Sequence, residues 1–206
     1  MLDVTDQIGR ALRTIEGMAL MDEKRFTAAN IADVLADTFE VQDEDKGNLR
    51  HRVRYLAKKH YLRGGKAIDK RGTLDFPTSE VFHAAILCEF LSLSMDIKIA
   101  SSALKQAEKD FRLSPGNYPD SARRHGGWAF SGYLETVLRG IEADEDWWLV
   151  VELRRSGTID AAGLLGRFTH ANEQRADVDA TFGRAPAATV LKVNLTKLFG
   201  KILENL

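Results

Sequence analysis

Residues 48–62 read NLRHRVRYLAKKHYL, and this stretch decides the fold that the sequence predicts. Stepping 100° per residue around a helix brings four residues into one narrow arc: Leu49, Val53, Leu56 and His60. The opposite side is crowded with basic side chains. We therefore predict a helix from about Lys46 to about Tyr61, anchored through one face and strongly basic on the other.

Positive charge is concentrated in this part of the chain. The protein has 206 residues and a formal net charge of −1, yet residues 46–71 hold ten Lys or Arg and one acid, Asp69, for a net charge of +9. The other residues carry 19 basic and 29 acidic side chains, a net charge of −10. Such a block is typical of either a disordered arm or a surface for a polyanion. The apolar period of the predicted helix argues against the disordered arm.

Short elements are predicted on both sides of the basic helix. After it, the alternation in Lys66–Ile68 and Gly72–Phe76 favours two strands joined by a turn at 69–71, and Pro77 closes this part. Before it, the spacing predicts helices over 4–20 and 28–39, the second capped by Thr27. The acidic residues 41–45 are predicted as a connection, in which Asp45 caps the basic helix.

The order of helix, helix, basic helix and hairpin resembles that of winged-helix transcription factors. The likeness rests on FTAANIADVL, residues 26–35, and on residues 48–62, which look like a recognition helix ending in an aliphatic residue before the wing. The segment LDFPTSEV, residues 74–81, followed by a long apolar helix, looks like MerR-type regulators, where a helix leads from the wing toward a dimer interface. The likeness covers roughly residues 4–110. It implies a winged helix-turn-helix DNA-binding domain over residues 1–77.

On this resemblance the basic helix lies in the major groove of DNA, where side chains reach base edges. The residues expected at or near the bases are Asn48, His51, Arg52 and Tyr55. The residues expected at phosphates are Arg50, Arg54, Lys58 and Lys59. On the wing, the residues expected at the adjacent backbone or in the minor groove are Lys66, Lys70 and Arg71.

The rest of the chain is predicted as connecting helices and a small C-terminal domain. Residues 78–111 are expected to connect or to dimerise, with Thr78 or Ser79 as N-cap and a break near 92–96. Residues 112–127 are typical of a linker, and 128–206 are expected to form an α+β domain. Its predicted elements are strands at 147–153 and 189–195, a helix or strand at 161–168, a loop at 175–188 and a helix at 196–206. The whole chain is thus predicted to be mainly α.

No catalytic or metal site and no cofactor is predicted. Glu80 and His83 share a helix face, but two ligands do not make a metal site. The glycines at 126–127 belong to no phosphate-loop motif. Cys88 is the single cysteine and lies in an apolar run, so we expect a buried thiol, no disulfide and a reducing compartment. With no leader and no apolar stretch of about 20 residues, we expect a cytoplasmic protein without a membrane span.

Three functions fit these observations. The first is a homodimeric, sequence-specific transcriptional regulator of double-stranded DNA, whose C-terminal domain binds a small-molecule effector or a protein partner. The second is a DNA-architectural accessory factor of a mobile element, which uses the same module. The third is a winged-helix protein-interaction module that meets an acidic partner. An enzyme is not expected, because no hydrolase or nucleotide-binding signature is present.

Overall fold

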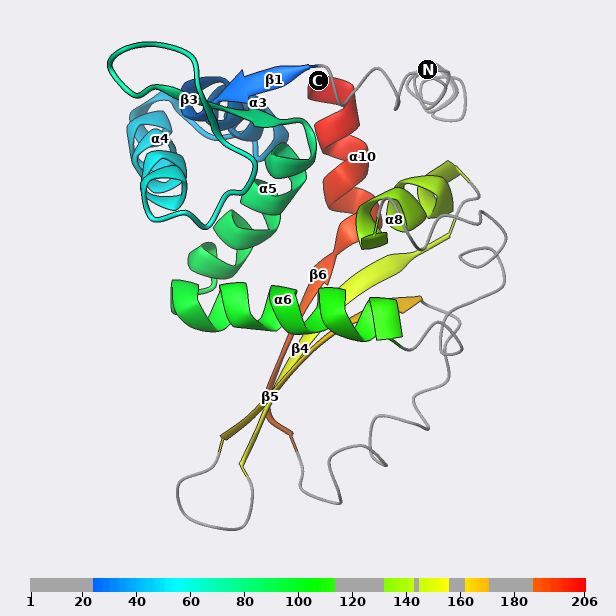
Figure 1. Ribbon diagram of the computed structural model, residues 1–206. Coiled ribbons are helices and arrows are strands. Elements are labelled where there is room, and N and C mark those ends of the chain that lie inside the picture. The colour runs from blue at the N-terminus through cyan, green and yellow to red at the C-terminus, as the bar shows by residue number, and fades with distance from the viewer. Residues whose placement is uncertain (1–23, 114–131, 143–144, 156–161, 171–186) are drawn as a thin grey trace. The chain divides into compact units, whose positions relative to one another are not determined.

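The structure is a computed structural model that describes residues 24–113, 132–142, 145–155, 162–170 and 187–206. These residues are mainly helical, with two small antiparallel sheets, which confirms the expected fold class at this level (Figure 1). The predicted helix over 4–20 and the linker from residue 114 onward lie outside the described residues.

Two compact units make up the chain. The first consists of the described part of Met1–Ile97 together with Lys197–Leu206, and the second is Lys98–Thr196. The units divide the chain at other places than the predicted boundaries after residues 77 and 111. The C-terminal ten residues belong with the N-terminal unit, although the sequence placed them in the last domain.

The N-terminal part of the first unit combines short strands with three helices. Its elements are β1 (Arg25–Thr27), α3 (Ala28–Thr38), α4 (Asp43–Lys58), β2 (Lys66–Ala67), β3 (Leu74–Pro77) and α5 (Ser79–Ser92). The sheet has the order β1-β3-β2, and β3 is antiparallel to both neighbours, with Phe26 opposite Phe76 and Lys66 opposite Asp75. The predicted hairpin is therefore present as β2 and β3. Strand β1 was not predicted, because a three-residue strand has too few positions to show alternation.

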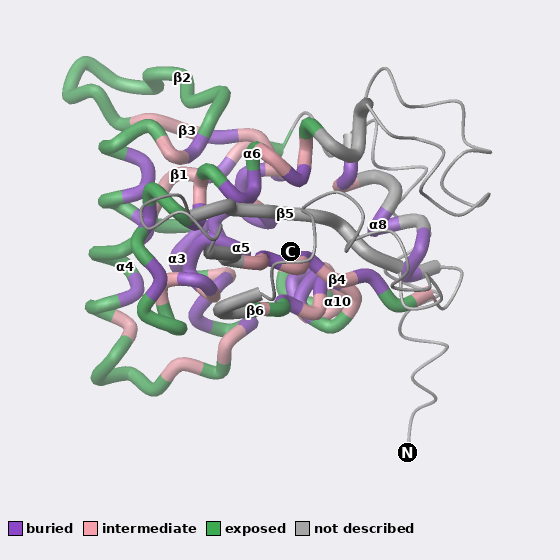
Figure 2. The backbone as a smooth tube through the Cα atoms, turned by 90° about the horizontal axis from the view of Figure 1, so that it is seen from below, coloured by how far each residue is buried: buried purple, intermediate pink, exposed green. Residues whose placement is uncertain are grey.

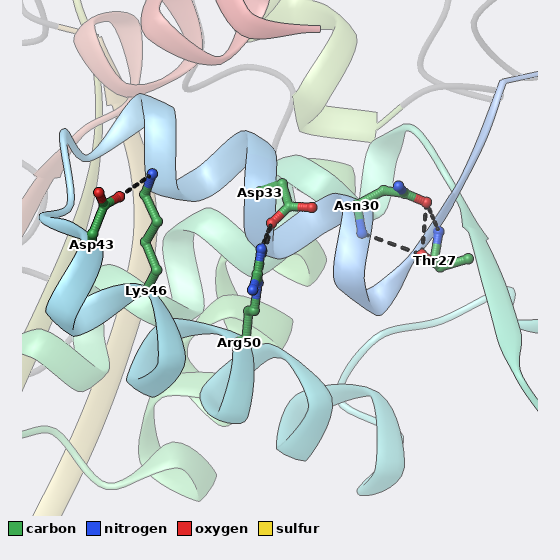
Figure 3. Close-up of polar contacts among 6 residues, drawn as sticks. All are labelled: Thr27, Asn30, Asp33, Asp43, Lys46 and Arg50. Atoms are coloured by element: carbon green, nitrogen blue, oxygen red, sulfur yellow. Dashed lines mark hydrogen bonds and ion pairs between the residues drawn. The ribbon is translucent and has the colours of Figure 1, made fainter.

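Thr27 caps α3, as its sequence position predicts. Its Oγ1 accepts a hydrogen bond from the Asn30 backbone N–H at 3.2 Å, and the Asn30 Oδ1 accepts one from the Thr27 N–H at 3.2 Å (Figure 3). Each side chain thus satisfies a backbone donor that the first turn of a helix leaves without an acceptor. This reciprocal cap fixes the start of α3 directly after β1.

Helices α3, α4 and α5 end in the same way. The second residue after each helix has a left-handed backbone: Glu40 (φ 55°), His60 (φ 58°) and Ser94 (φ 60°). The amide that follows binds the carbonyl five residues back, with Val41 to Ala36 at 2.8 Å, Tyr61 to Leu56 at 2.9 Å and Met95 to Phe90 at 3.0 Å. These are Schellman motifs built without glycine. The third of them confirms the break that the sequence predicted near residues 92–96.

The C-terminal helix α10 (Leu195–Asn205) completes the first unit. The ring of Phe199 meets that of Phe82 on α5 edge to face, with centroids 4.8 Å apart, and both side chains are buried. Lys201 Nζ lies 2.6 Å from Glu40 Oε1, and Lys24 Nζ donates to the Leu206 carbonyl at 2.5 Å. An apolar anchor and two polar contacts thus hold the end of the chain to the N-terminal unit.

The second unit is built on a three-stranded antiparallel sheet. Its elements are α6 (Ile97–Leu113), whose first residue ends the first unit, α8 (Gly132–Glu142), β4 (Trp147–Arg155), β5 (Ala162–His170) and β6 (Ala187–Asn194). The strand order is β5-β4-β6. The structure confirms the strands predicted near 147–153 and 189–195, and it resolves the ambiguous stretch near 161–168 as a strand. Helix α8 was not predicted.

A tryptophan joins α8 to β4. Trp147 is fully buried, and a Cβ added at Gly140 would overlap its indole ring, so glycine is required where the helix passes this ring. The indole Nε1 donates to Glu145 Oε2 at 3.1 Å, and the Glu145 N–H donates to the Gly140 carbonyl at 2.7 Å. Close packing and satisfied donors together fix the start of β4.

We predict opposite effects from two neighbouring changes in α10. Phe199→Ala removes a buried ring and should lower the stability of the first unit by about 3–5 kcal/mol. Gly200→Ala should raise it by roughly 0.4–1 kcal/mol, because a Cβ there meets no atom within 4 Å. Urea unfolding followed by far-ultraviolet circular dichroism measures both effects. Tryptophan fluorescence reports the second unit, since Trp147 and Trp148 lie in its strand β4 and the third tryptophan of the sequence also falls within the range 98–196. Equal midpoints for the two variants would contradict this role of α10.

The Cys88 thiol should be inert in the folded protein. Burial disfavours the thiolate and raises the pKa of Cys88 to about 12, so the reactive form is rare near pH 8.5. Iodoacetamide at about that pH should label the native protein at least 100-fold more slowly than the urea-unfolded chain. Mass spectrometry over a time course measures the two rates. Equal rates would show that the thiol is accessible in the folded state.

Candidate nucleic-acid interface

Helix α4 separates a buried apolar face from an exposed polar one. Leu49, Val53 and Leu56 are buried, as their spacing predicts, and Ala57 joins them. All eleven residues predicted to contact DNA are exposed, and we call them the candidate surface: Asn48, Arg50, His51, Arg52, Arg54, Tyr55, Lys58, Lys59, Lys66, Lys70 and Arg71. Figure 2 shows the exposed side of α4 and the exposed hairpin at β2 in green. Burial of the apolar face therefore presents the candidate surface to solvent.

The prediction for this helix was wrong at its ends and at one residue of its face. Helix α4 starts and stops three residues before the predicted positions, at Asp43 and Lys58. His60 was placed on the apolar face, but it is exposed and has a left-handed backbone. The helical period no longer applies there, because the Schellman motif ends the helix before His60.

The three-residue shift places an acidic first turn at the start of α4. Asp43, Glu44 and Asp45 lie inside the helix, whereas the sequence had suggested a connection with Asp45 as N-cap. Gln42 is the N-cap residue and makes no side-chain capping bond. Carboxylates in a first turn interact favourably with the helix dipole, which is a physical reason for helix to begin here.

Part of the positive charge at this end is neutralised. Lys46 Nζ lies 2.8 Å from Asp43 Oδ1 (Figure 3), and Asn48 Nδ2 donates to Asp45 Oδ1 at 3.3 Å. The hydrogen bond from Lys46 lowers the pKa of Asp43, and the same contact raises the pKa of Lys46. Both groups therefore stay charged and paired at neutral pH. The excess of positive charge on α4 begins one turn into the helix.

Arg50 differs from the other cations of the candidate surface because it is held by a neighbouring helix. Its Nη2 and Nε lie 2.8 and 3.2 Å from Asp33 Oδ1 on α3 (Figure 3). Both side chains are about half exposed, so the pair contributes little to stability. It does fix the direction of the Arg50 guanidinium, which points from α4 toward α3 (Figure 3).

The tip of the β2–β3 hairpin is organised around Asp69. Its carboxylate accepts hydrogen bonds from the Arg71 N–H at 2.9 Å, the Thr73 N–H at 2.8 Å and the Thr73 hydroxyl at 2.7 Å. These donors, the Thr73 hydroxyl above all, lower the pKa of Asp69. The carboxylate of the lone acid in the basic block thus binds groups within the tip, and Lys70 and Arg71 are exposed beside it.

Arg25 binds both stems of this hairpin. Its Nη2 donates to the Gly64 carbonyl at 2.8 Å and to the Asp75 carbonyl at 2.9 Å, and its Nε lies 2.8 Å from Asp75 Oδ1. Both side chains are largely buried, so little solvent screens the pair. Gly64 and Gly65 allow the first stem of the hairpin to pass close to β3. Gly64 has φ +66°, and a Cβ on Gly65 would meet the Phe76 ring at 2.8 Å.

A buried carboxylate fixes the chain between α4 and the hairpin. Glu80, at the start of α5, is 3% exposed, and its Oε2 accepts a hydrogen bond from the Arg63 N–H at 2.8 Å. Its Oε1 lies 2.8 Å from His83 Nδ1. The Glu80 carboxylate noted in the sequence therefore binds a backbone amide with one oxygen and the His83 ring with the other.

An aromatic stack supports the middle of the candidate surface. The rings of Tyr55 and Tyr61 lie 6.4 Å apart at an interplanar angle of 29°. Tyr61 reaches this place because the left-handed His60 turns the chain back along α4. Tyr55 remains 40% exposed, so its ring is oriented by a neighbour and still open to a ligand.

Two features were not found in the described part of the chain, a metal-binding cluster and a membrane-spanning helix. It contains no group of three or more His, Cys, Asp or Glu side chains placed to hold a metal ion. Its helices include none that is both long and apolar enough to cross a membrane. Compared with known proteins, the chain matches no family model and no curated protein sequence.

The sequence did not reveal the residues that position the hairpin. Arg25 precedes an apolar residue in a strand too short to recognise, and Glu80 was considered only with His83, as two ligands, too few for a metal site. One available signal was the burial expected around Glu80, whose neighbours Val81 and Phe82 are apolar. A carboxylate in such surroundings must find donors, and the nearest loop supplies one.

We predict that Arg25→Ala loosens the hairpin. The change removes three contacts from its stems, so trypsin should cleave after Lys66, Lys70 or Arg71 about tenfold faster. Mass spectrometry of the first fragments measures the rate at these sites. Arg50→Ala is the matched control, because it removes one arginine and its exposed ion pair with Asp33 and should leave the hairpin protected. Identical cleavage of both variants and the parent protein would show that Arg25 does not hold the hairpin.

Proposed function

We propose that the chain is a sequence-specific DNA-binding transcriptional regulator that uses α4 as a recognition helix and the β2–β3 hairpin as a wing. One observation carries this proposal. All eleven residues of the candidate surface are exposed, on a helix anchored by a buried apolar face and on a hairpin fixed at its stems. A solvated charged face is the ordinary alternative, but a net charge of +9 within 26 residues is a footprint expected for a polyanion.

The proposed arrangement is a winged helix. It is supported by the order β1, α3, α4, β2 and β3, and by a sheet in which β3 lies between β1 and β2. In such a module the second helix of the helix-turn-helix enters the major groove. Here that helix is α4, and Asp33 on α3 directs its Arg50 side chain.

The candidate surface divides into two kinds of contact under this proposal. Arg52 and Asn48 suit base edges, since Arg binds guanine and Asn binds adenine through paired hydrogen bonds. Tyr55 lies beside them with its ring braced by Tyr61. Arg54, Lys58 and Lys59 suit phosphates, which fix register without reading sequence. Arg50 reaches a phosphate only by leaving Asp33, so its contribution is the smallest expected of the four.

Dimerisation and a ligand or partner for the second unit belong to the same proposal. A regulator that binds as a two-fold dimer reads a palindromic site with half-sites about one helical turn apart. The second unit would then carry the effector or partner site, and the protein would work in the cytoplasm.

Binding to duplex DNA across a salt series tests the proposal. We expect a dissociation constant near 10⁻⁴–10⁻⁶ M for a random duplex, of the order usual for non-specific binding, rising steeply with salt. Arg52→Ala/Arg54→Ala should weaken binding and reduce the slope of log K against log salt by about 1 to 2. Fluorescence anisotropy of a labelled duplex measures both quantities.

Lys105→Ala/Lys109→Ala is the matched control. It also removes two exposed cations, but from α6 in the second unit, so it should leave the slope unchanged. Equal losses of affinity and of salt slope in the two double variants would show that the effect comes from net charge and not from the candidate surface. No binding at low salt would contradict the proposal and favour a protein-interaction module.

A further inference from the structure

An aliphatic side chain stands exposed in the middle of the basic hairpin. Ile68 is 53% exposed, the highest value among the large apolar side chains in the described part of the chain. It follows Lys66–Ala67 of β2 and precedes Lys70 and Arg71, all of which are exposed. In residues 46–71 the other large apolar side chain that is exposed is Tyr55.

The backbone holds Ile68 in a defined place. Its N–H donates to the Thr73 carbonyl at 2.9 Å, which extends the β2–β3 pairing one step beyond Ala67 opposite Leu74. The Asp69 carboxylate then closes the tip, and Gly72 takes the left-handed backbone (φ 78°) that the turn requires. Ile68 is therefore presented by a closed turn, so little conformational entropy is lost when it meets a ligand.

The cations around Ile68 and its own side chain call for different partners. Lys66, Lys70 and Arg71 suit phosphates, but phosphates offer nothing to an aliphatic group. The minor groove offers a partner to the cations and to the aliphatic group. Phosphates line its edges, and apolar side chains are known to enter between its base pairs. A wing beside a recognition helix in the major groove lies next to this groove.

We propose that Ile68 is an apolar wedge that enters the minor groove and opens a base step, so that the bound DNA is bent. The inference rests on the proposed function and deepens it, because it adds a residue that reads the deformability of DNA. Pyrimidine–purine steps such as TA unstack most easily. The protein therefore prefers a site with TA steps beneath the wing over a stiff A-tract of the same base composition.

Two end-labelled duplexes of about 30 base pairs test this, one with a run of TA steps at its centre and one with an A-tract. Energy transfer between the ends measures bending, and anisotropy measures affinity. We expect the parent protein to raise the transfer on the TA duplex and to bind it about three- to tenfold more tightly than the A-tract duplex. Ile68→Ala should lose the bend and the preference, and keep the salt slope, because no cation is removed.

Two further variants serve as controls. Ile68→Leu keeps the apolar bulk and should retain the bend. Leu93→Ala removes an aliphatic side chain of similar exposure (49%) beyond the end of α5 and should change nothing. If the parent protein binds without bending, or if Ile68→Ala bends DNA as well as the parent, the wedge is wrong and the proposed function stands. If the parent protein binds neither duplex, both are wrong.

Discussion

Arg25 fixes the stems of the hairpin that carries part of the candidate surface. Its guanidinium binds a carbonyl at one stem of the hairpin and both a carbonyl and the carboxylate of Asp75 at the other. Glu80 fixes the same connection from the other side through the Arg63 amide. Hydrogen bonds from a charged guanidinium are stronger than those between neutral groups, so a basic loop that would repel itself becomes a hairpin of defined shape. These contacts fix the stems of the hairpin, and Asp69 fixes its tip, where Lys70 and Arg71 lie.

Much of this surface could be predicted from the sequence, because helix faces follow from spacing. The apolar residues of α4 recur at intervals of three and four, at Leu49, Val53 and Leu56. Burial of this apolar face leaves the residues between them exposed. Thr27 was recognisable as a cap because its hydroxyl can accept from an amide three residues on. The hairpin was recognisable from alternation and from turn-forming residues around Asp69.

The failures have equally specific causes. His60 was assigned to a face because helical period says nothing of where a helix stops, and a Schellman motif formed without its usual glycine. The acidic residues 43–45 looked like a connection, although the helix dipole favours them within a first turn. Strand β1 and the place of α10 depend on partners distant in sequence, such as Pro77 for Arg25 and Phe82 for Phe199. No local pattern encodes these contacts.

The docking of α10 makes the first unit discontinuous in sequence, with the second unit inserted between residues 97 and 197. During synthesis, the face of α5 around Phe82 thus emerges from the ribosome long before Phe199 does. At ordinary elongation rates the interval is roughly 5–20 s, far longer than a helix needs to form. For that time the nascent protein carries an uncovered aromatic ring on an incomplete core. A chaperone that binds exposed aromatic segments could act during this interval. The second unit would have to fold before the first unit has acquired α10.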